Sequence, residues 1–316
     1  MPGKWLRTLD YDGAAVAVGR NTYQLPRSNF INYIDVAFHR CGCATQTLLT
    51  AACNFTSLQV VGNGASVLKD YTMRDARVIN IFDYGSSHTY FSAIVEGVES
   101  CIGVRIDFGR FVHDTTCILP AKAFKQLDLI IVATAITGAD LWDDDVLVSI
   151  EVEQYISADD PAKKNILKDT IIRTDAAAAT QIDVSCPLGL WLRGFVIILD
   201  EMTGNWYNDV MLRVNNGAEI PWTGEMYMQV AKNALEKNIG KATYTAASMV
   251  PSECELLELT NELEDSAYFE IDLDPKRTLE DALHTETMND LTLRIPRAAS
   301  SADKVLMREV IVLSGG

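Results

Sequence analysis

The sequence predicts an all-β chain built as two tandem, eight-stranded antiparallel jelly rolls (a double jelly roll) with short helices. Three observations predict this fold class. Blocks of the first half recur in order in the second half, and short alternating apolar runs predict strands. Gly, Asn and Pro separate those runs, and no long alternating helices occur between them. With 316 residues, the chain is long enough for two domains that each have a core.

The clearest repeat is a pair of strands, the first of which has Ile-Asp followed by an apolar residue at its centre. Val104–Phe108 precedes a strand over Leu127–Ile131, and Phe269–Leu273 precedes a strand over Leu291–Ile295. The two central aspartates are 165 positions apart (272 − 107). Because this period is the length of a domain and far exceeds a solenoid repeat, we infer a duplicated domain.

Two earlier blocks recur in the same order. Leu25-Pro26 resembles Cys186-Pro187, and each pair precedes an alternating apolar strand. Asn63-Gly64 resembles Asn216-Gly217, at an offset of 153 (217 − 64). Both Asn-Gly pairs lie between apolar runs, and both residues of such a turn accept positive φ, so each pair predicts a hairpin.

Alternation and helical spacing predict the remaining elements. The first half is expected to hold strands over 31–38, 58–61, 65–68, 90–95, 104–108, 127–133 and 147–153, with a short helix over 71–80. The second half is expected to hold strands over 171–172, 182–185, 190–199, 210–214, 269–273, 291–295 and 305–313, a helix over 227–237, and further helical turns over 256–263 and 279–283.

The repeat blocks divide the chain into four expected segments. Residues 1–19 precede the first repeat and have no counterpart in the second half, so they are expected to be an N-terminal assembly arm outside the first core. The first jelly roll is expected over 20–156 and the second over 169–316. Residues 157–168 are expected to be the linker, because they begin with a polar, aperiodic stretch that contains Pro161.

The charge balance excludes several classes of function. The chain has 27 basic and 43 acidic residues, a net charge of −16, and neither end carries a basic arm. Direct sequence-specific binding to nucleic acid is therefore not expected. No apolar run reaches the roughly 20 residues of a membrane span, and no secretory signal is evident. The seven cysteines are expected to be buried or half-buried free thiols of a protein made in a reducing cytoplasm.

The sequence contains no recognisable motif for catalysis, metal binding or phosphate binding. No catalytic, cofactor-binding or metal-binding residue is predicted, no cofactor is expected, and the chain is not expected to be an enzyme. Cys41-Gly42-Cys43 is too isolated for a zinc site. The acidic run of Asp140 and Asp143–Asp145 lacks the EF-hand pattern. Trp191, Trp206 and Trp222 fit either a sugar-stacking platform or packing, and Trp191 is expected in the core.

Together these features resemble the double jelly-roll major capsid proteins of tailless icosahedral viruses, the lineage of the adenovirus hexon and the membrane-containing phages. The resemblance rests on Leu25-Pro26, Asn63-Gly64, the strand Ile106-Asp107-Phe108 leading to Leu119-Pro120, and their counterparts in the second half. It spans about residues 20 to 313. Since the longest loop candidate is 242–264, a large surface tower is not expected.

The resemblance implies a structural protein of the virion, from a bacteriophage or archaeal virus, with no active site. It implies a homotrimer whose six barrels form a pseudo-hexagonal capsomer. The implied partners are other copies of the chain, neighbouring capsomers and penton or minor capsid proteins, with contact to an internal membrane through the N-terminus where one is present. A carbohydrate-binding or carbohydrate-cleaving β-sandwich protein is the alternative, and an accessory virion protein such as a spike base is a third.

Overall fold

The structure is a computed structural model of the chain, and it is mostly β. It describes residues 3–41, 46–47, 55–84, 93–94, 99–134, 146–158, 164–175, 181–199, 209–225, 228–229, 232–233, 267–296 and 303–311. The chain forms two compact units. Unit 1 comprises residues 1–80, 87–168 and 311–316, and unit 2 comprises residues 81–86 and 169–310.

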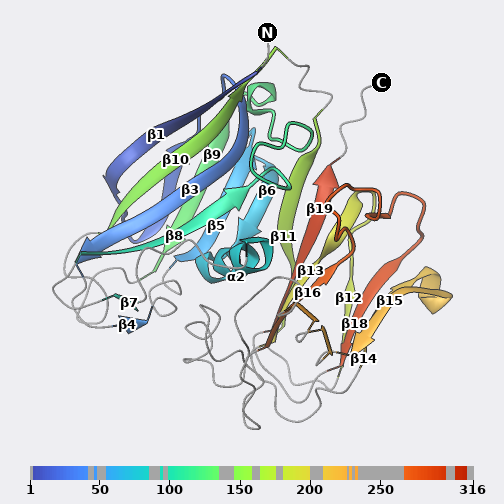
Figure 1. Cartoon of the computed structure of the whole chain (residues 1–316). Coiled ribbons are helices and arrows are strands. Elements are labelled where there is room, and N and C mark those ends of the chain that lie inside the picture. Colours follow the sequence, from blue (N-terminus) through green and yellow to red (C-terminus); the bar gives the residue numbers. More distant parts are fainter. Residues whose placement is uncertain are drawn as a thin grey trace. The chain divides into compact units, whose positions relative to one another are not determined.

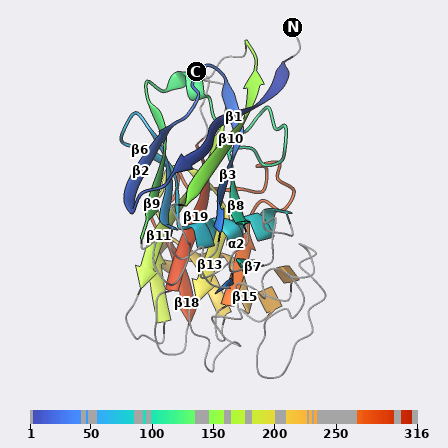
Figure 2. The same ribbon diagram turned by 90° about the vertical axis from the view of Figure 1, so that its left-hand side faces the viewer.

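One sheet of unit 1 pairs strands that lie far apart in the sequence. It consists of β1 (Lys4–Ala15), β10 (Leu147–Ile156), β3 (Phe30–Cys41) and β8 (Glu99–Asp107), antiparallel in that order (Figure 1). Figure 2 shows β1, β10 and β3 side by side from a second direction. The alternating apolar residues of β3 and β10 point to one face and are buried, as the period of two predicts.

The second layer of unit 1 has the strand order β2-β9-β5-β6. Its strands are β2 (Gly19–Gln24), β9 (Leu127–Ala133), β5 (Phe55–Gly62) and β6 (Ser66–Tyr71). The predicted β5–β6 hairpin is confirmed, with positive φ of 53° at Asn63 and 72° at the glycine that follows it. A separate short pair consists of β4 (Gln46–Thr47) and β7 (Ala93–Ile94).

The core of unit 1 lies between these two layers. The ring of Phe38, on β3, stacks on that of Phe55, on β5, with centroids 3.9 Å apart, and both side chains are fully buried. Val148, Ile150 and Val152 of β10 are also fully buried. The strand predicted over 147–153 is part of β10, and its inward face is apolar.

The predicted helix of the first half is α2 (Met73–Tyr84), which continues four residues beyond the expected end. A reciprocal capping box starts it. The backbone N–H of Thr72 donates to the Asp75 carboxylate at 3.0 Å, and the N–H of Asp75 donates to the Thr72 hydroxyl at 3.1 Å. The boundary between the units falls within α2, after Asn80.

Unit 2 contains a layer with β13 (Trp191–Leu199) between β16 (Ala267–Asp272) and β19 (Asp303–Ile311). β17 (Leu283–His284) also pairs with β13. The boundary between the two units also falls within β11 (Ile166–Asp175), after Lys168.

The other sheet of unit 2 has the order β12-β18-β14-β15. Its strands are β12 (Gln181–Ser185), β18 (Leu291–Pro296), β14 (Asp209–Val214) and β15 (Glu219–Glu225). The predicted hairpin between β14 and β15 is confirmed, although a short 3₁₀ turn, η3 (Asn215–Gly217), closes it. The inward residues of both layers form one apolar cluster, which includes Leu212, Phe269, Leu293 and Met307.

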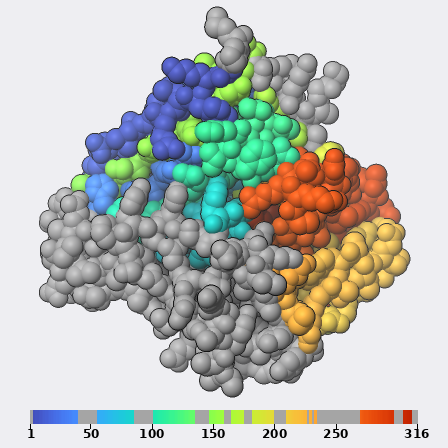
Figure 3. All heavy atoms as spheres, viewed as in Figure 1, coloured from blue at the N-terminus to red at the C-terminus, as the bar shows by residue number. Residues whose placement is uncertain are grey.

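Some predictions are refined by the structure. Within the proposed N-terminal arm, β1 is a strand at the edge of a sheet, and most of its side chains are exposed (Figure 3). The segment was expected outside the first core, and in the structure its backbone extends the sheet by pairing with β10. A role in assembly stays a prediction for this segment, as do the four predicted domain ranges.

Other predictions differ from the structure or fall outside it. The expected helical turn over 279–283 is wrong, since the chain there consists of bends that lead into β17. A second 3₁₀ turn, η1 (Ala121–Ala123), was not predicted. Of the expected helix over 227–237, residues 228–229 and 232–233 are described, and they are helical. The acidic run at 140–145, Trp206 and the loop over 242–264 lie outside the described residues.

Candidate functional site

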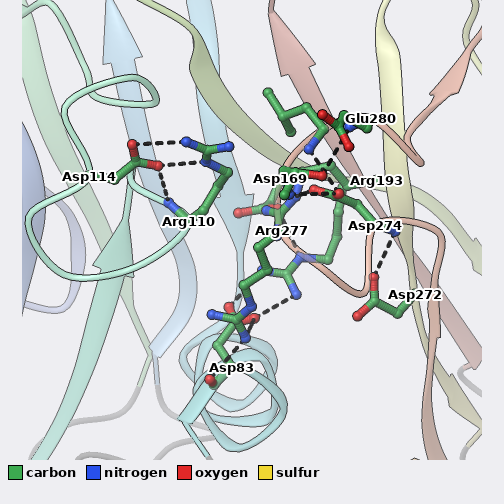
Figure 4. Close-up of polar contacts among 12 residues, drawn as sticks. Asp83, Arg110, Asp114, Asp169, Arg193, Asp272, Asp274, Arg277 and Glu280 are labelled. Atoms are coloured by element: carbon green, nitrogen blue, oxygen red, sulfur yellow. Dashed lines mark hydrogen bonds and ion pairs between the residues drawn. The ribbon is translucent and has the colours of Figure 1, made fainter.

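The densest group of buried charges in the described part of unit 2 surrounds Arg308 of β19. Its guanidinium lies 2.6 Å from Asp83 of α2, 2.7 Å from Glu270 of β16 and 3.4 Å from Asp169 of β11. All four side chains are less than a tenth exposed. Arg277 adds a second cation, 3.5 Å from the Asp83 carboxylate. The group therefore joins one helix, three strands and a loop of unit 2 (Figure 4).

The electrostatics of this group favour its charged form. Burial alone would raise the pKa of the Asp83 carboxyl, but the adjacent Arg308, with Arg277 and Arg193, holds that pKa well below its usual range. Burial opposes the charge of Arg308 as well, yet its three carboxylate neighbours raise its pKa well above the ordinary value. A buried ion group of this kind holds elements in register, and breaking it leaves an uncompensated charge.

A second polar centre in unit 2 is Asp274, which is fully buried in the loop after β16. Its carboxylate accepts the backbone N–H groups of Thr278 at 3.1 Å and Leu279 at 2.9 Å (Figure 4). Its own N–H donates to the carboxylate of Asp272 at 2.9 Å. Burial raises the pKa of Asp274 in spite of these hydrogen bonds and of Arg193 nearby. This residue organises a loop, as an Asx turn does.

Asp114 has the corresponding role in unit 1. It is buried in the loop after β8, and its carboxylate accepts the backbone N–H groups of Arg110, Thr116 and Cys117 at 3.2, 2.9 and 3.1 Å. The Arg110 guanidinium adds two contacts of 2.7 and 3.1 Å (Figure 4). Although burial would raise the pKa of Asp114, these donors lower it. These contacts hold the backbone of the loop around the Asp114 carboxylate.

The outer face of the first sheet of unit 1 carries another group. The Tyr33 ring lies 3.7 Å from the guanidinium carbon of Arg105, and its hydroxyl donates to Glu153 at 3.2 Å. Arg7 donates to the same hydroxyl at 2.5 Å. Burial raises the pKa of Tyr33 to about 12, so the phenol, which is protonated at neutral pH in any case, stays protonated further into the alkaline range. A protonated phenol among ion pairs is a structural donor here.

These groups lack the parts that a catalytic or metal site needs. Among the described residues, no cluster of three or more His, Cys, Asp or Glu side chains is arranged to hold a metal ion. A cavity of about 530 Å³ opens in unit 1 beside Asp10, Tyr11 and Arg27, with Gln24, Leu25, Pro26 and Ser28 completing its lining. No nucleophile paired with a base lines this cavity. No helix in the described part of the chain is long and apolar enough to cross a membrane.

The described tryptophans and cysteines lie at separate positions in the two units. Trp191, expected in the core, is half-buried. It stacks on His284 at 4.0 Å and donates to Glu286 at 2.7 Å, so its ring lies at the surface of unit 2. Trp222 packs against the apolar cluster of unit 2. Cys101, Cys117 and Cys186 are free thiols.

Sequence reasoning missed the Arg308 group and both buried aspartates. One signal was available. Arg308 interrupts an apolar strand, and a charge at such a position usually needs a buried partner. Its partners come from distant segments, which no local pattern identifies.

The fold has clear counterparts among solved structures. The major capsid protein of STIV (Sulfolobus turreted icosahedral virus) is 13% identical in sequence. The match covers 98% of this chain and 97% of that one, with a TM-score of 0.67. The major capsid protein P2 of bacteriophage PM2 is 12% identical over 98% and 96% of the two chains, with a TM-score of 0.60. A chain of the PBCV-1 virus capsid is 9% identical over 98% and 93%, with a TM-score of 0.61.

The chain therefore has the double jelly-roll fold of viral major capsid proteins, and the predicted fold class and resemblance are confirmed. Sequence comparison adds nothing to this, since no family model and no curated protein matches the chain.

Proposed function

We propose that this chain is the major capsid protein of an icosahedral virus and that three copies form a pseudo-hexagonal capsomer. The observation that supports this most strongly is the extent of the structural likeness. It covers 98% of the chain and nearly the whole of each capsid protein compared, so both units correspond. A carbohydrate-binding β-sandwich protein, the alternative, needs no second copy of the domain, so that function would leave the duplication unexplained.

The duplication also supports the trimer on physical grounds. Two related barrels in one chain offer similar flanks, so a contact between subunits can imitate the contact within one. Three chains then close a ring of six barrels, and closed symmetry leaves no interface free to propagate. The expected partners are further copies of the chain, neighbouring capsomers and penton or minor capsid proteins, and the location is the virion.

The polar groups described above fit this role. Each one holds backbone or strands together, and none pairs a nucleophile with a base. We therefore propose that the chain has no enzymatic activity. A screen of glycosidase and esterase substrates tests this, and turnover that is lost when a single carboxylate is replaced would overturn it.

The experiment for the capsomer is a mass measurement in solution followed by electron microscopy. We expect a particle of three times the 34.9 kDa chain mass, with a hexagonal outline in projection. A stable monomer or dimer at micromolar concentration would contradict the trimer, as would a trimer whose barrels lie end to end.

A further inference from the structure

The chain contains two Asn-Gly pairs, and each forms the turn of a hairpin: Asn63-Gly64 in unit 1 and Asn216-Gly217 in unit 2. In such a pair the backbone nitrogen of glycine can attack the side-chain amide carbon of asparagine, because glycine has no side chain to block the approach. In a folded protein the reaction depends on how firmly the turn is held. The two turns of this chain differ in that respect.

The first turn is held by the loop beside it. The backbone N–H of Asn63 donates to the carbonyl of Gln126 at 2.7 Å. Its side-chain oxygen accepts the N–H groups of Lys125 at 2.7 Å and of Gln126 at 3.4 Å. In this hairpin β5 lies between two partner strands, β6 and β9, and three of the six residues of β6 are buried. Opening this turn therefore breaks bonds of the reacting side chain and disturbs buried strands.

The second turn has fewer restraints. Asn216 is exposed, and no described residue hydrogen-bonds to its side-chain amide. Its backbone N–H donates to the Asp290 carboxylate at 2.6 Å. Asn215 bonds to the carbonyl of Asp290 and the N–H of Asn289, and both distances are 3.3 Å. β15 is an edge strand, and none of its seven residues is buried (Figure 1). Segments with so few buried contacts open locally at a low cost in free energy.

The backbone of the second turn determines which step limits the reaction. Asn216 has φ 56° and ψ 30°, so the nitrogen of Gly217 is turned towards the backbone nitrogen of Asn216 and away from its Cβ. The turn must therefore open before a ring can close. A side chain is excluded at Gly217, because its φ is 81° and a Cβ there would overlap the guanidinium of Arg213. That guanidinium also places a positive charge beside Gly217, which favours the anionic nitrogen that attacks.

We propose that Asn216 is a site of spontaneous deamidation, with water as the co-reactant. The amide nitrogen of Gly217 loses its proton to water and bonds to Cγ of Asn216. The C–N bond of the side-chain amide breaks, and its NH₂ group takes up a proton and leaves as ammonia. Water then opens the succinimide ring at either carbonyl, which gives aspartate or isoaspartate without oxidation or reduction. This inference goes beyond the proposed capsid function, since the reaction needs only the hairpin and water.

Both products should loosen the hairpin. The new carboxylate is held close to that of Asp290, because the backbone at position 216 is bonded to it, and two like charges repel. Isoaspartate also adds a carbon atom to the backbone within the turn. The pairing of β14 with β15, as between Leu212 and Trp222, must then shift or open. The modification therefore changes an exposed sheet edge of unit 2 with time.

The test is incubation of the full-length protein at neutral pH, followed by peptide mapping with mass spectrometry. We expect Asn216 to convert at least about tenfold faster than Asn63, since the second turn opens more easily. Asp290→Ala should accelerate the conversion at least about threefold, because it removes the acceptor of the Asn216 N–H and a negative charge beside the attacking nitrogen. Asp281→Ala is the control. It removes an exposed carboxylate that pairs with Lys276, and it should leave the rate unchanged.

The denatured chain supplies a second control. In denaturant the two asparagines should convert at similar rates, because both precede glycine and neither turn is formed. Equal rates in the folded protein would overturn the inference, as would an Asn216 that stays intact while the denatured chain reacts. The trimer mass, measured on the unmodified protein at the start of the incubation, separates failure of this inference from failure of the proposed capsomer.

Discussion

The side-chain amides of Asn80 in unit 1 and Asn233 in unit 2 each accept a backbone N–H of a strand at 2.8 Å. The amide of Asn80 donates to the carbonyl of Arg105 and accepts its N–H, each at 2.8 Å, on the edge strand β8. The amide oxygen of Asn233 accepts the N–H of Glu270 at 2.8 Å on β16, and Gln229 donates to the carbonyl of Glu270 at 2.7 Å. In each unit, side-chain amides thus hydrogen-bond to backbone groups of an edge strand, β8 in unit 1 and β16 in unit 2.

The spacing of these contacts repeats that of the sequence blocks. The two asparagines are 153 positions apart (233 − 80), which is the offset of the two hairpin glycines. Arg105 and Glu270 are 165 positions apart (270 − 105), which is the offset of the two strand aspartates. The duplication thus extends from the order of the strands to individual hydrogen bonds.

Replacing Asn80 with Leu should destabilise unit 1 by about 1–3 kcal/mol. Leucine has a similar volume, but it leaves the N–H and carbonyl of Arg105 without their partner at a buried position. Denaturant unfolding measures the change. Asn29→Leu is the control, because that amide is partly exposed and bonds to side chains only, and it should cost less than about 1 kcal/mol. Equal losses in the two variants would contradict the role of the backbone contact.

Replacing Arg308 with Met should destabilise unit 2 by about 3–5 kcal/mol. Methionine fills the space of the side-chain stem but leaves Asp83, Asp169 and Glu270 buried without their shared cation. Arg294→Met is the matched control. Arg294 also makes two short bonds to a carboxylate, that of Asp183, but both side chains are about a third or more exposed, so about 1 kcal/mol or less is expected. A loss below 1 kcal/mol for Arg308→Met would show that the group is dispensable.

The Asp83 carboxyl should make stability depend on pH in the acidic range. Its folded pKa lies below the unfolded value of about 3.9, so the ionised group stabilises the fold at any pH above about 4. That stabilisation is lost as the pH falls below about 4 toward the folded pKa. Unfolding midpoints of the wild type and of Asp83→Asn should differ between pH 5 and 7 and converge below pH 4. A difference that stays constant down to pH 2.5 would contradict this assignment.

The sequence predicted the elements whose signal is local. Asn63-Gly64 and the alternation of β3 and β10 depend on a few neighbouring residues, and each predicted its element correctly. Long-range chemistry was not predictable in this way. Asp83 and Arg308 are 225 positions apart, and only the folded chain brings their charges together. Trp191 was misjudged because an apolar strand has two faces, and its ring lies on the face that bears His284.

The last prediction concerns the loop that Asp114 organises. Asp114→Ala removes the acceptor of three backbone N–H groups and the partner of Arg110, so the loop should lose its fixed conformation while the sheets of unit 1 remain folded. We expect hydrogen exchange at the amides of Thr116 and Cys117 to become at least about tenfold faster, as the loss of hydrogen bonds to a charged group predicts.

Exchange in β10 and in β3 after Asn32 should stay unchanged in this variant, because the backbone bonds between β3 and the loop are those of Ile31 and Asn32. Asp183→Ala is the control, since that carboxylate contacts Arg294 and Gln181 at the surface of unit 2 and should leave exchange near Asp114 as it is. Unchanged protection at Thr116 and Cys117 in Asp114→Ala would mean that the loop holds its shape without the carboxylate. The stack of His113 on Trp5 would then be the remaining contact that holds this loop against β1.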